Sequence, residues 1–171
     1  CIRDRGGDKI FTFLRTAGPT ISPFNAWVFT RGLETVSLRM KAHCENASKI
    51  ASWLESHAKV ERVYYPGLIN HPGFEVASRQ MRGFGGMLSF ELADDIDPVS
   101  YIRRLELVIC AVSLGGVETT ICQPVATSHQ KVSENERQRL GITDGLLRLS
   151  VGIEDAEDIS ADLLQVLNKG A

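Results

Sequence analysis

An apolar stripe with helical spacing runs from residue 36 to residue 54 and constrains the architecture more than any other feature. Its members recur every three or four residues: Val36, Met40, His43, Ala47, Ile50 and Leu54. Upstream, Ser22-Pro23 is a typical helix start, with a serine N-cap and proline at the first helical position. Gly32 is the expected break between a first helix and a long second one. Helices over residues 21–57 would span roughly 50 Å at 1.5 Å per residue, which is enough to link two bodies.

Beyond residue 58 the pattern changes to short alternating strands and helices. The expected strands are 60–65, 86–92, 107–111 and 146–151. The expected helices are 73–81, 98–105, 133–140 and 156–167. This order predicts an α+β fold in which helices pack on one side of a sheet.

Composition excludes several classes of function. The 171 residues include 19 Lys and Arg against 21 Asp and Glu, so a net charge of -2 argues against nucleic-acid binding through bulk electrostatics. No apolar run reaches the roughly 18–20 residues needed to span a bilayer. The cysteines are widely spaced without a Cys-x-x-Cys pair, which favours neither disulfides nor a metal site and indicates a cytoplasmic protein. Because the chain opens at Cys1, we expect a processed N-terminus or the C-terminal part of a longer protein.

One arginine stands inside an apolar strand, in Leu146-Leu147-Arg148-Leu149-Ser150-Val151-Gly152. An arginine in that position keeps its charge, so it must reach water or meet an anion. From the residues alone, two partners remain open. One is an internal carboxylate, Glu118 or Glu154; the other is a substrate carboxylate held by a bidentate clamp.

A glycine-bearing loop, Val112 to Glu118, follows the apolar strand expected at 107–111. Small residues at the end of a strand permit a ligand to approach the backbone closely. A second glycine cluster, Gly83 to Gly86, precedes a strand rather than a helix. It therefore predicts a tight strand entry and not a phosphate-binding loop.

Several motifs together resemble one known family. They are Ser22-Pro23-Phe24-Asn25-Ala26-Trp27, Arg31-Gly32-Leu33-Glu34-Thr35, Tyr65-Pro66-Gly67-Leu68, Ser113-Leu114-Gly115-Gly116, Gly141-Ile142-Thr143-Asp144-Gly145 and Leu147-Arg148-Leu149-Ser150-Val151-Gly152-Ile153-Glu154-Asp155. Over nearly its whole length the chain resembles the C-terminal portion of the pyridoxal-phosphate-dependent Cys/Met metabolism enzymes. These include cystathionine γ-synthase, cystathionine γ-lyase, methionine γ-lyase and O-succinyl- or O-acetylhomoserine sulfhydrylase.

The resemblance implies a fold of the aspartate-aminotransferase type (fold type I), with a large cofactor-binding domain and a small C-terminal domain. Residues 1–20 would be the tail of the large domain, 21–57 the connecting helices and 58–171 the small domain. The Schiff-base lysine, in a Ser-x-Thr-Lys setting, is expected before Cys1 together with the cofactor-binding residues. None of the six lysines has that setting: Lys9, Lys41, Lys49, Lys59, Lys131 and Lys169. We also expect exposed apolar side chains near the start: Phe11, Phe13, Phe24 and Trp27.

The resemblance also implies a substrate site. Arg148 matches the family's arginine for the substrate α-carboxylate, and Ser113 and Leu114 match the loop that lines the same site. Ser128 stands where relatives usually have Thr in Met-Thr-His. Val112 stands where cystathionine-handling members commonly carry Glu, so we expect a substrate with an uncharged γ-group.

The expected function is the making or breaking of a C–S bond at the γ-carbon of a homoserine- or methionine-like amino acid, with elimination and replacement both open. The implied cofactor is pyridoxal 5'-phosphate. The implied partners are a small amino-acid substrate, the rest of the large domain and further copies in a homotetramer. A different class stays open, because the chain lacks the Schiff-base lysine: a non-catalytic interaction or carboxylate-binding domain.

Overall fold

The computed structural model describes residues 7–169, and its contacts group the chain into two units, 1–37 and 38–171. The first unit contains helices α2 (Gly7–Ala17) and α3 (Pro23–Glu34). The predicted start of α3 is confirmed, because the Asn25 backbone N–H donates to the Ser22 hydroxyl at 3.2 Å and Pro23 is the first helical residue.

The predicted break at Gly32 is wrong by three residues. Gly32 lies inside α3, and the chain leaves helical geometry at Thr35, whose φ and ψ are -110° and 1°. A single glycine lowers helix stability by about 1 kcal/mol but does not end a helix. Thr35 is β-branched, and its backbone N–H bonds to the Leu33 carbonyl rather than continuing the regular ladder.

Helices α2 and α3 bury no side chain among the described residues. The prediction that apolar side chains are exposed here is confirmed, with exposed fractions of 66% for Phe11, 65% for Phe13, 69% for Phe24 and 59% for Trp27. Such a face is typical of a segment that packs against further polypeptide. The division at residues 20 and 57 stays a prediction.

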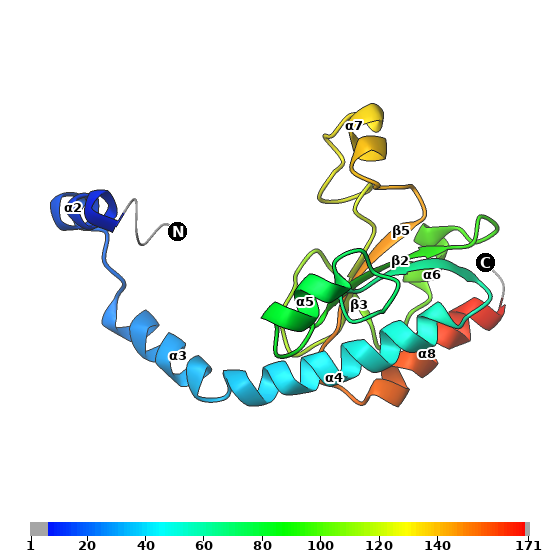
Figure 1. Ribbon diagram of the computed structural model, residues 1–171, viewed down its shortest axis with the longest axis horizontal. Helices are drawn as coiled ribbons and strands as arrows, with labels where there is room; N and C mark the ends of the chain where they lie inside the picture. The colour runs from blue at the N-terminus through cyan, green and yellow to red at the C-terminus, as the bar shows by residue number, and fades with distance from the viewer. Residues whose placement is uncertain (1–6, 170–171) are drawn as a thin grey trace. The chain divides into compact units, whose positions relative to one another are not determined.

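The second unit is built on a five-stranded sheet in the order β1-β2-β5-β4-β3. The paired strands β2 and β5 are labelled in Figure 1. Its strands are β1 (Val60–Tyr64), β2 (Met87–Leu92), β3 (Ile109–Cys110), β4 (Thr120–Cys122) and β5 (Leu146–Ser150). All neighbours are antiparallel except β3 and β4, which run parallel. Strand β4 was not predicted, and β3 is shorter than the strand predicted at 107–111. The predicted strand entry at Gly83–Gly86 is confirmed, since β2 begins directly after it.

Five helices belong wholly or mainly to this unit: α4 (Val36–Glu55), α5 (Phe74–Gln80), α6 (Pro98–Arg103), α7 (Glu134–Arg139) and α8 (Ala156–Lys169). Residues of α4, α6 and α8 share one hydrophobic core with Leu88 and Phe90 of β2 and with Leu147 and Leu149 of β5. The helical layer on one face of the sheet is therefore as predicted. The apolar stripe of α4 is buried from His43 onward, whereas Val36 and Met40 are exposed.

Asp162 on α8 fixes the turn that leads into β3. Its carboxylate accepts the backbone N–H groups of Glu106, Leu107 and Val108, each at 2.9 Å. Burial opposes ionisation, but these bonds and one from Gln165 outweigh it and lower the pKa of Asp162. The backbone of residues 106–108, which leads into β3 and the loop beyond it, is thus held in place by α8.

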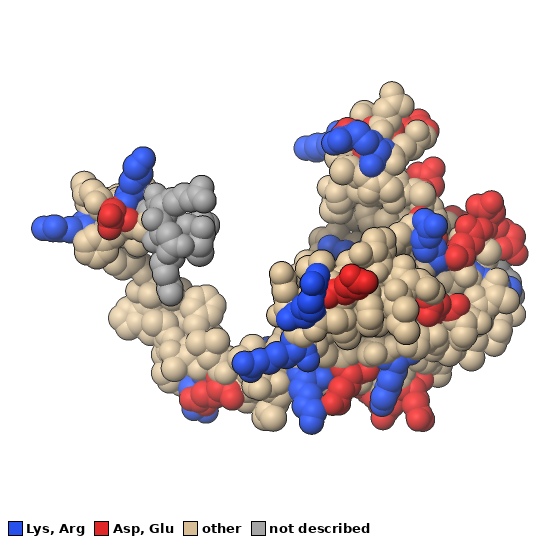
Figure 2. Space-filling view, in the orientation of Figure 1, with Lys and Arg blue, Asp and Glu red and all other residues tan. Residues whose placement is uncertain are grey.

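The surface carries charges of both signs. On the face seen in Figure 2, basic and acidic side chains are intermixed, in line with the net charge of -2. Within residues 7–169, no helix combines the length and the apolar character that crossing a membrane requires.

Candidate functional site

The face of the sheet opposite the helices carries Arg148 at its centre. In β5 the neighbours Leu147 and Leu149 are fully buried in the core, so the intervening Arg148 points to the other face. Its register partners are Ser89 on β2 and Cys122 on β4, which lie on that same face. Alternation along a central strand therefore places one cation on the side that the helices leave uncovered.

The glycine-bearing loop from Val112 to Glu118 lies against this face and holds the guanidinium group. Nη2 of Arg148 donates to the carbonyl of Val112 at 2.8 Å and to that of Ser113 at 3.0 Å. The Thr120 hydroxyl also donates to the Ser113 carbonyl at 3.0 Å, and the Gly115 backbone N–H donates to the Ser150 hydroxyl at 2.9 Å. Gly115 has a φ of 73°, which favours glycine at this turn.

Arg148 has no carboxylate partner within the part of the chain that the structure describes. The ion pairs of the described residues include Arg31–Glu34, Lys41–Glu45 and Arg139–Glu136, and none of these involves Arg148. The predicted alternative of an internal partner is wrong. The Glu154 carboxylate accepts both the backbone N–H and the hydroxyl of Thr119, at 2.6 and 2.8 Å, and Glu118 forms no ion pair with the arginine.

The Nε atom of Arg148 is buried and has no hydrogen-bond partner among residues 7–169. It is the one buried side-chain nitrogen or oxygen in that range of which this is true. An unmade hydrogen bond of a buried group costs about 1–3 kcal/mol, and more when the group is charged. The permanently charged guanidinium of Arg148 therefore keeps hydrogen-bond donor capacity that no described residue uses.

Of the other predicted site residues, some lie next to Arg148 and one, Ser128, has no described bond to it. Val112 and Ser113 contact Arg148 through their main-chain carbonyls, and Leu114 follows them in the loop. The side chains of Val112 and Leu114 are 57% and 59% exposed. The Ser128 hydroxyl lies 2.9 Å from Nδ1 of His129. Among the described residues no hydrogen bond joins Ser128 to Arg148 or to the loop, so its place in the site stays a prediction.

Sequence reasoning missed two residues that hold the loop, Thr120 and Ser150. Both are buried polar residues within short strands, and each makes one hydrogen bond to the main chain of the loop. The available signal was Ser150 itself, a small hydroxyl residue in an otherwise apolar strand next to Arg148. Thr120 gave no such signal because its strand was not predicted.

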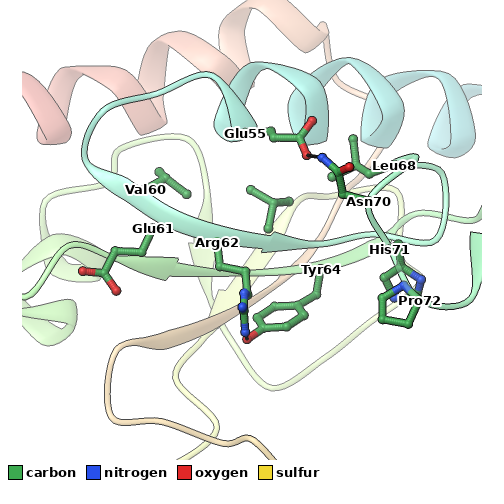
Figure 3. Close-up of a pocket in the computed structure, with 10 residues that line it drawn as sticks. Glu55, Val60, Glu61, Arg62, Tyr64, Leu68, Asn70, His71 and Pro72 are labelled. Atoms are coloured by element: carbon green, nitrogen blue, oxygen red, sulfur yellow. Dashed lines mark hydrogen bonds between the residues drawn. The ribbon is translucent and has the colours of Figure 1, made fainter.

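A pocket of about 480 Å³ lies elsewhere, along the edge strand β1 (Figure 3). Its lining includes Glu55 at the end of α4, Arg62 and Tyr64 of β1, and Asn70 and His71 of the following turn. Asn70 bonds to Glu55 at 3.4 Å, and Arg62 bonds to the Tyr64 hydroxyl at 3.4 Å, which raises the pKa of Arg62. Strand β2 separates this edge from β5, and the pocket holds no buried polar group that lacks a partner among the described residues. It is not the candidate site.

Comparison with known proteins identifies the family. The model of the Cys/Met metabolism PLP-dependent enzymes matches residues 3–168, so the chain belongs to this family. O-succinylhomoserine sulfhydrylase of Pseudomonas aeruginosa is 46% identical over 160 residues, which are 93% of this chain and 40% of that protein. Cystathionine beta-lyase of Coxiella burnetii is 50% identical over 147 residues, 85% of this chain and 38% of that protein.

The fold is similar to that of a solved relative. The crystal structure of cystathionine gamma-lyase from Lactobacillus plantarum complexed with L-serine matches with a TM-score of 0.88 and 40% identity, over 95% of this chain and 42% of that one. The chain thus spans about 40% of the length of the curated relatives that it matches.

Pyridoxal phosphate is the cofactor of the family. The described lysines do not offer a site for it: none stands in a Ser-x-Thr-Lys setting, Nζ of Lys59 donates to the Leu167 carbonyl at 2.6 Å, and Lys41 lies 3.9 Å from Glu45. The described residues thus include no lysine in the setting expected for the Schiff base. What they place beside the 112–118 loop is the guanidinium group of Arg148, which donates to two loop carbonyls and has no described partner for Nε.

Proposed function

We propose that this chain is the part of a PLP-dependent transsulfuration-type enzyme that holds the α-carboxylate of the amino-acid substrate. The reaction makes or breaks a C–S bond at the γ-carbon of a homoserine- or methionine-like amino acid, in a cytoplasmic homotetramer of the full-length protein. The observation that carries the proposal is the buried, unpartnered Nε of Arg148, an arginine without any described carboxylate partner.

The geometry supports a positioning role for Arg148. When bound, the cofactor ring accepts the electrons released at the α-carbon, and the protein must hold the substrate in a fixed pose beside it. A guanidinium gives two parallel N–H···O bonds to a carboxylate and so fixes the rotation of the substrate as well as its position. The carbonyls of Val112 and Ser113 hold Nη2 and thereby fix the plane of the guanidinium, and a forked contact with the carboxylate replaces one of these two bonds.

Removing the charge of the substrate's α-carboxylate tests the proposal in the full-length enzyme. We expect the α-carboxamide of a substrate to react with a kcat/KM about 100-fold below that of the parent acid, because charge-assisted bonds contribute about 1.5–3 kcal/mol each. The measurement is kcat/KM for O-succinylhomoserine or methionine and for the matching amide. Equal values for acid and amide would contradict carboxylate recognition by an arginine.

Val112 gives a prediction about the distal end of the substrate. Its side chain is more than half exposed next to the carbonyl that binds Arg148, so a substituent there is free to reach a bound substrate. Replacing Val112 by Glu adds a partner for the second ammonium of cystathionine, worth up to about 1 kcal/mol at an exposed site. We expect the ratio of kcat/KM for cystathionine to that for methionine to rise about three- to fivefold.

Val112→Gln is the matched control, because it has the size of Glu without the charge. It should leave the substrate ratio within twofold of wild type. If Val112→Glu and Val112→Gln change the ratio equally, then side-chain size and not charge determines specificity at this position. A wild-type enzyme that prefers cystathionine would show that another residue binds the distal ammonium.

A further inference from the structure

A tight turn follows β5 and is bound to α4 on one side. Nδ1 of His43 lies 2.7 Å from the Val151 carbonyl and must donate, because a carbonyl oxygen only accepts. One turn along α4, the Asn46 amide donates to the carbonyls of Gly152 and Glu154 at 3.2 and 2.7 Å. Two side chains of α4 thus hold three backbone carbonyls of the turn, those of Val151, Gly152 and Glu154.

The same turn is bound on its other side to the end of the 112–118 loop. The Glu154 carboxylate accepts the Thr119 backbone N–H at 2.6 Å and the Thr119 hydroxyl at 2.8 Å. That hydroxyl accepts the Gly152 backbone N–H at 2.9 Å, and the Ile153 N–H donates to the Val117 carbonyl at 2.8 Å. Thr119 is fully buried, and its hydroxyl both donates and accepts a hydrogen bond inside the protein.

The loop is therefore anchored at both ends, and only one end touches the arginine. Its first residues supply the carbonyls that hold Nη2 of Arg148, while Val117 near its other end is held by Ile153, and Thr119, directly after the loop, is held by Glu154. Thr119 and Thr120 are adjacent, and Thr120 bonds back to the Ser113 carbonyl. A shift at Thr119 is thus transmitted to the carbonyl that orients the guanidinium.

We propose that Thr119, Glu154 and Asn46 form a clamp that sets the position of the 112–118 loop and, through it, the orientation of Arg148 toward the substrate carboxylate. These residues are positioning residues and do not contact substrate. The inference rests on the proposed function of Arg148. It assigns the Gly152-Ile153-Glu154 segment after the arginine strand a role in binding rather than in the core alone.

Thr119→Val tests the clamp in the full-length enzyme, since valine keeps the volume and removes the hydroxyl. We expect KM for the amino-acid substrate to rise about tenfold, with kcat and the cofactor absorbance within twofold of wild type. The preference for the acid over its carboxamide should fall by a similar factor. Thr119→Ser keeps the hydroxyl and should restore KM to within about threefold of wild type.

Thr30→Val is the matched control, because the Thr30 hydroxyl bonds only within its own helix, to the Ala26 carbonyl at 2.9 Å. It should leave KM unchanged. Should Thr119→Val fail to fold, Glu154→Gln tests the same clamp, since the amide keeps one acceptor oxygen and loses the charge. We expect the same rise in KM.

A double variant separates the clamp from a purely structural role. If Thr119 acts through Arg148, then Thr119→Val adds no further rise in KM to that of Arg148→Met. Effects that multiply, or a lower melting temperature with unchanged KM, would overturn the clamp. Normal kinetics of Thr119→Val beside a defective Arg148→Met would overturn the clamp and leave the proposed function standing, whereas a normal Arg148→Met would overturn the proposed function itself.

Discussion

Replacing Arg148 with methionine in the full-length enzyme is expected to lower kcat/KM for its amino-acid substrate about 100-fold, mainly through KM. Methionine keeps much of the length and apolar volume of the arginine stem but removes both N–H groups of the fork. Losing charge-assisted bonds of about 1.5–3 kcal/mol each accounts for a change of this size. The measurement is steady-state kinetics together with the cofactor absorbance, which should not change.

Arg148→Lys should recover little of this loss. An ammonium is a point charge and cannot make two parallel bonds to a carboxylate, nor can it keep the contacts of Nη2 with Val112 and Ser113. We expect kcat/KM to stay at least tenfold below wild type. Arg103→Met, at an exposed arginine in the last turn of α6, is the matched control and should behave as wild type.

A structural role for Arg148 gives a different pattern. If the guanidinium serves only to hold the loop, Arg148→Met lowers the melting temperature and leaves kcat/KM close to wild type. That outcome would contradict the substrate-binding assignment directly.

Gly152→Ala is expected to lower both the stability of the protein and its affinity for the substrate. A Cβ at this position would stand 2.7 Å from the backbone carbon of Glu118 and would also meet the Val117 carbonyl and the Glu154 carboxylate. Two of these three groups are backbone, which cannot rotate away as a flexible side chain does. Forcing extra volume into such a contact costs about 1–3 kcal/mol. We expect a lower melting temperature and, because segment 117–119 must move, a KM at least tenfold higher.

Gly32→Ala provides the comparison for this glycine. No atom lies within 4 Å of the position that its Cβ would take, and Gly32 is in the interior of α3. Alanine in a helix is more favourable than glycine by up to about 1 kcal/mol, so the melting temperature should not fall. An unchanged melting temperature and KM for Gly152→Ala would show that the loop tolerates displacement at Val117 and Glu118.

Periodicity was sufficient to predict the helical layer and the central strands. The α4 stripe and the alternation in β2 depend on local spacing, and burial follows it, with Leu88, Phe90 and Leu92 buried on one face. Arg148 could be singled out for the same reason, because a charged residue among Leu146, Leu147 and Leu149 interrupts a local pattern. These features need no knowledge of distant contacts.

Features that depend on distant contacts were missed or left open. Strand β4 has three residues and owes its existence to pairing with β5, which lies more than twenty residues later in the chain. The use of the Glu154 carboxylate by Thr119, 35 residues away in sequence, removed it as a partner for Arg148. Spacing does not show which of two acidic residues is already engaged. The break at Thr35 was misplaced because glycine was weighted above a β-branched residue.

Carboxylate binding by Arg148 is tested most sharply by combining one variant with one change in the substrate. In the full-length enzyme, kcat/KM is measured for a substrate and for its α-carboxamide, in wild type and in Arg148→Met. If Arg148 binds the carboxylate, the roughly 100-fold preference of wild type for the acid collapses to within about threefold in the variant, because the residue that distinguishes the two groups is gone. A variant that still prefers the acid about 100-fold would contradict carboxylate binding by Arg148, since another group would then recognise the carboxylate.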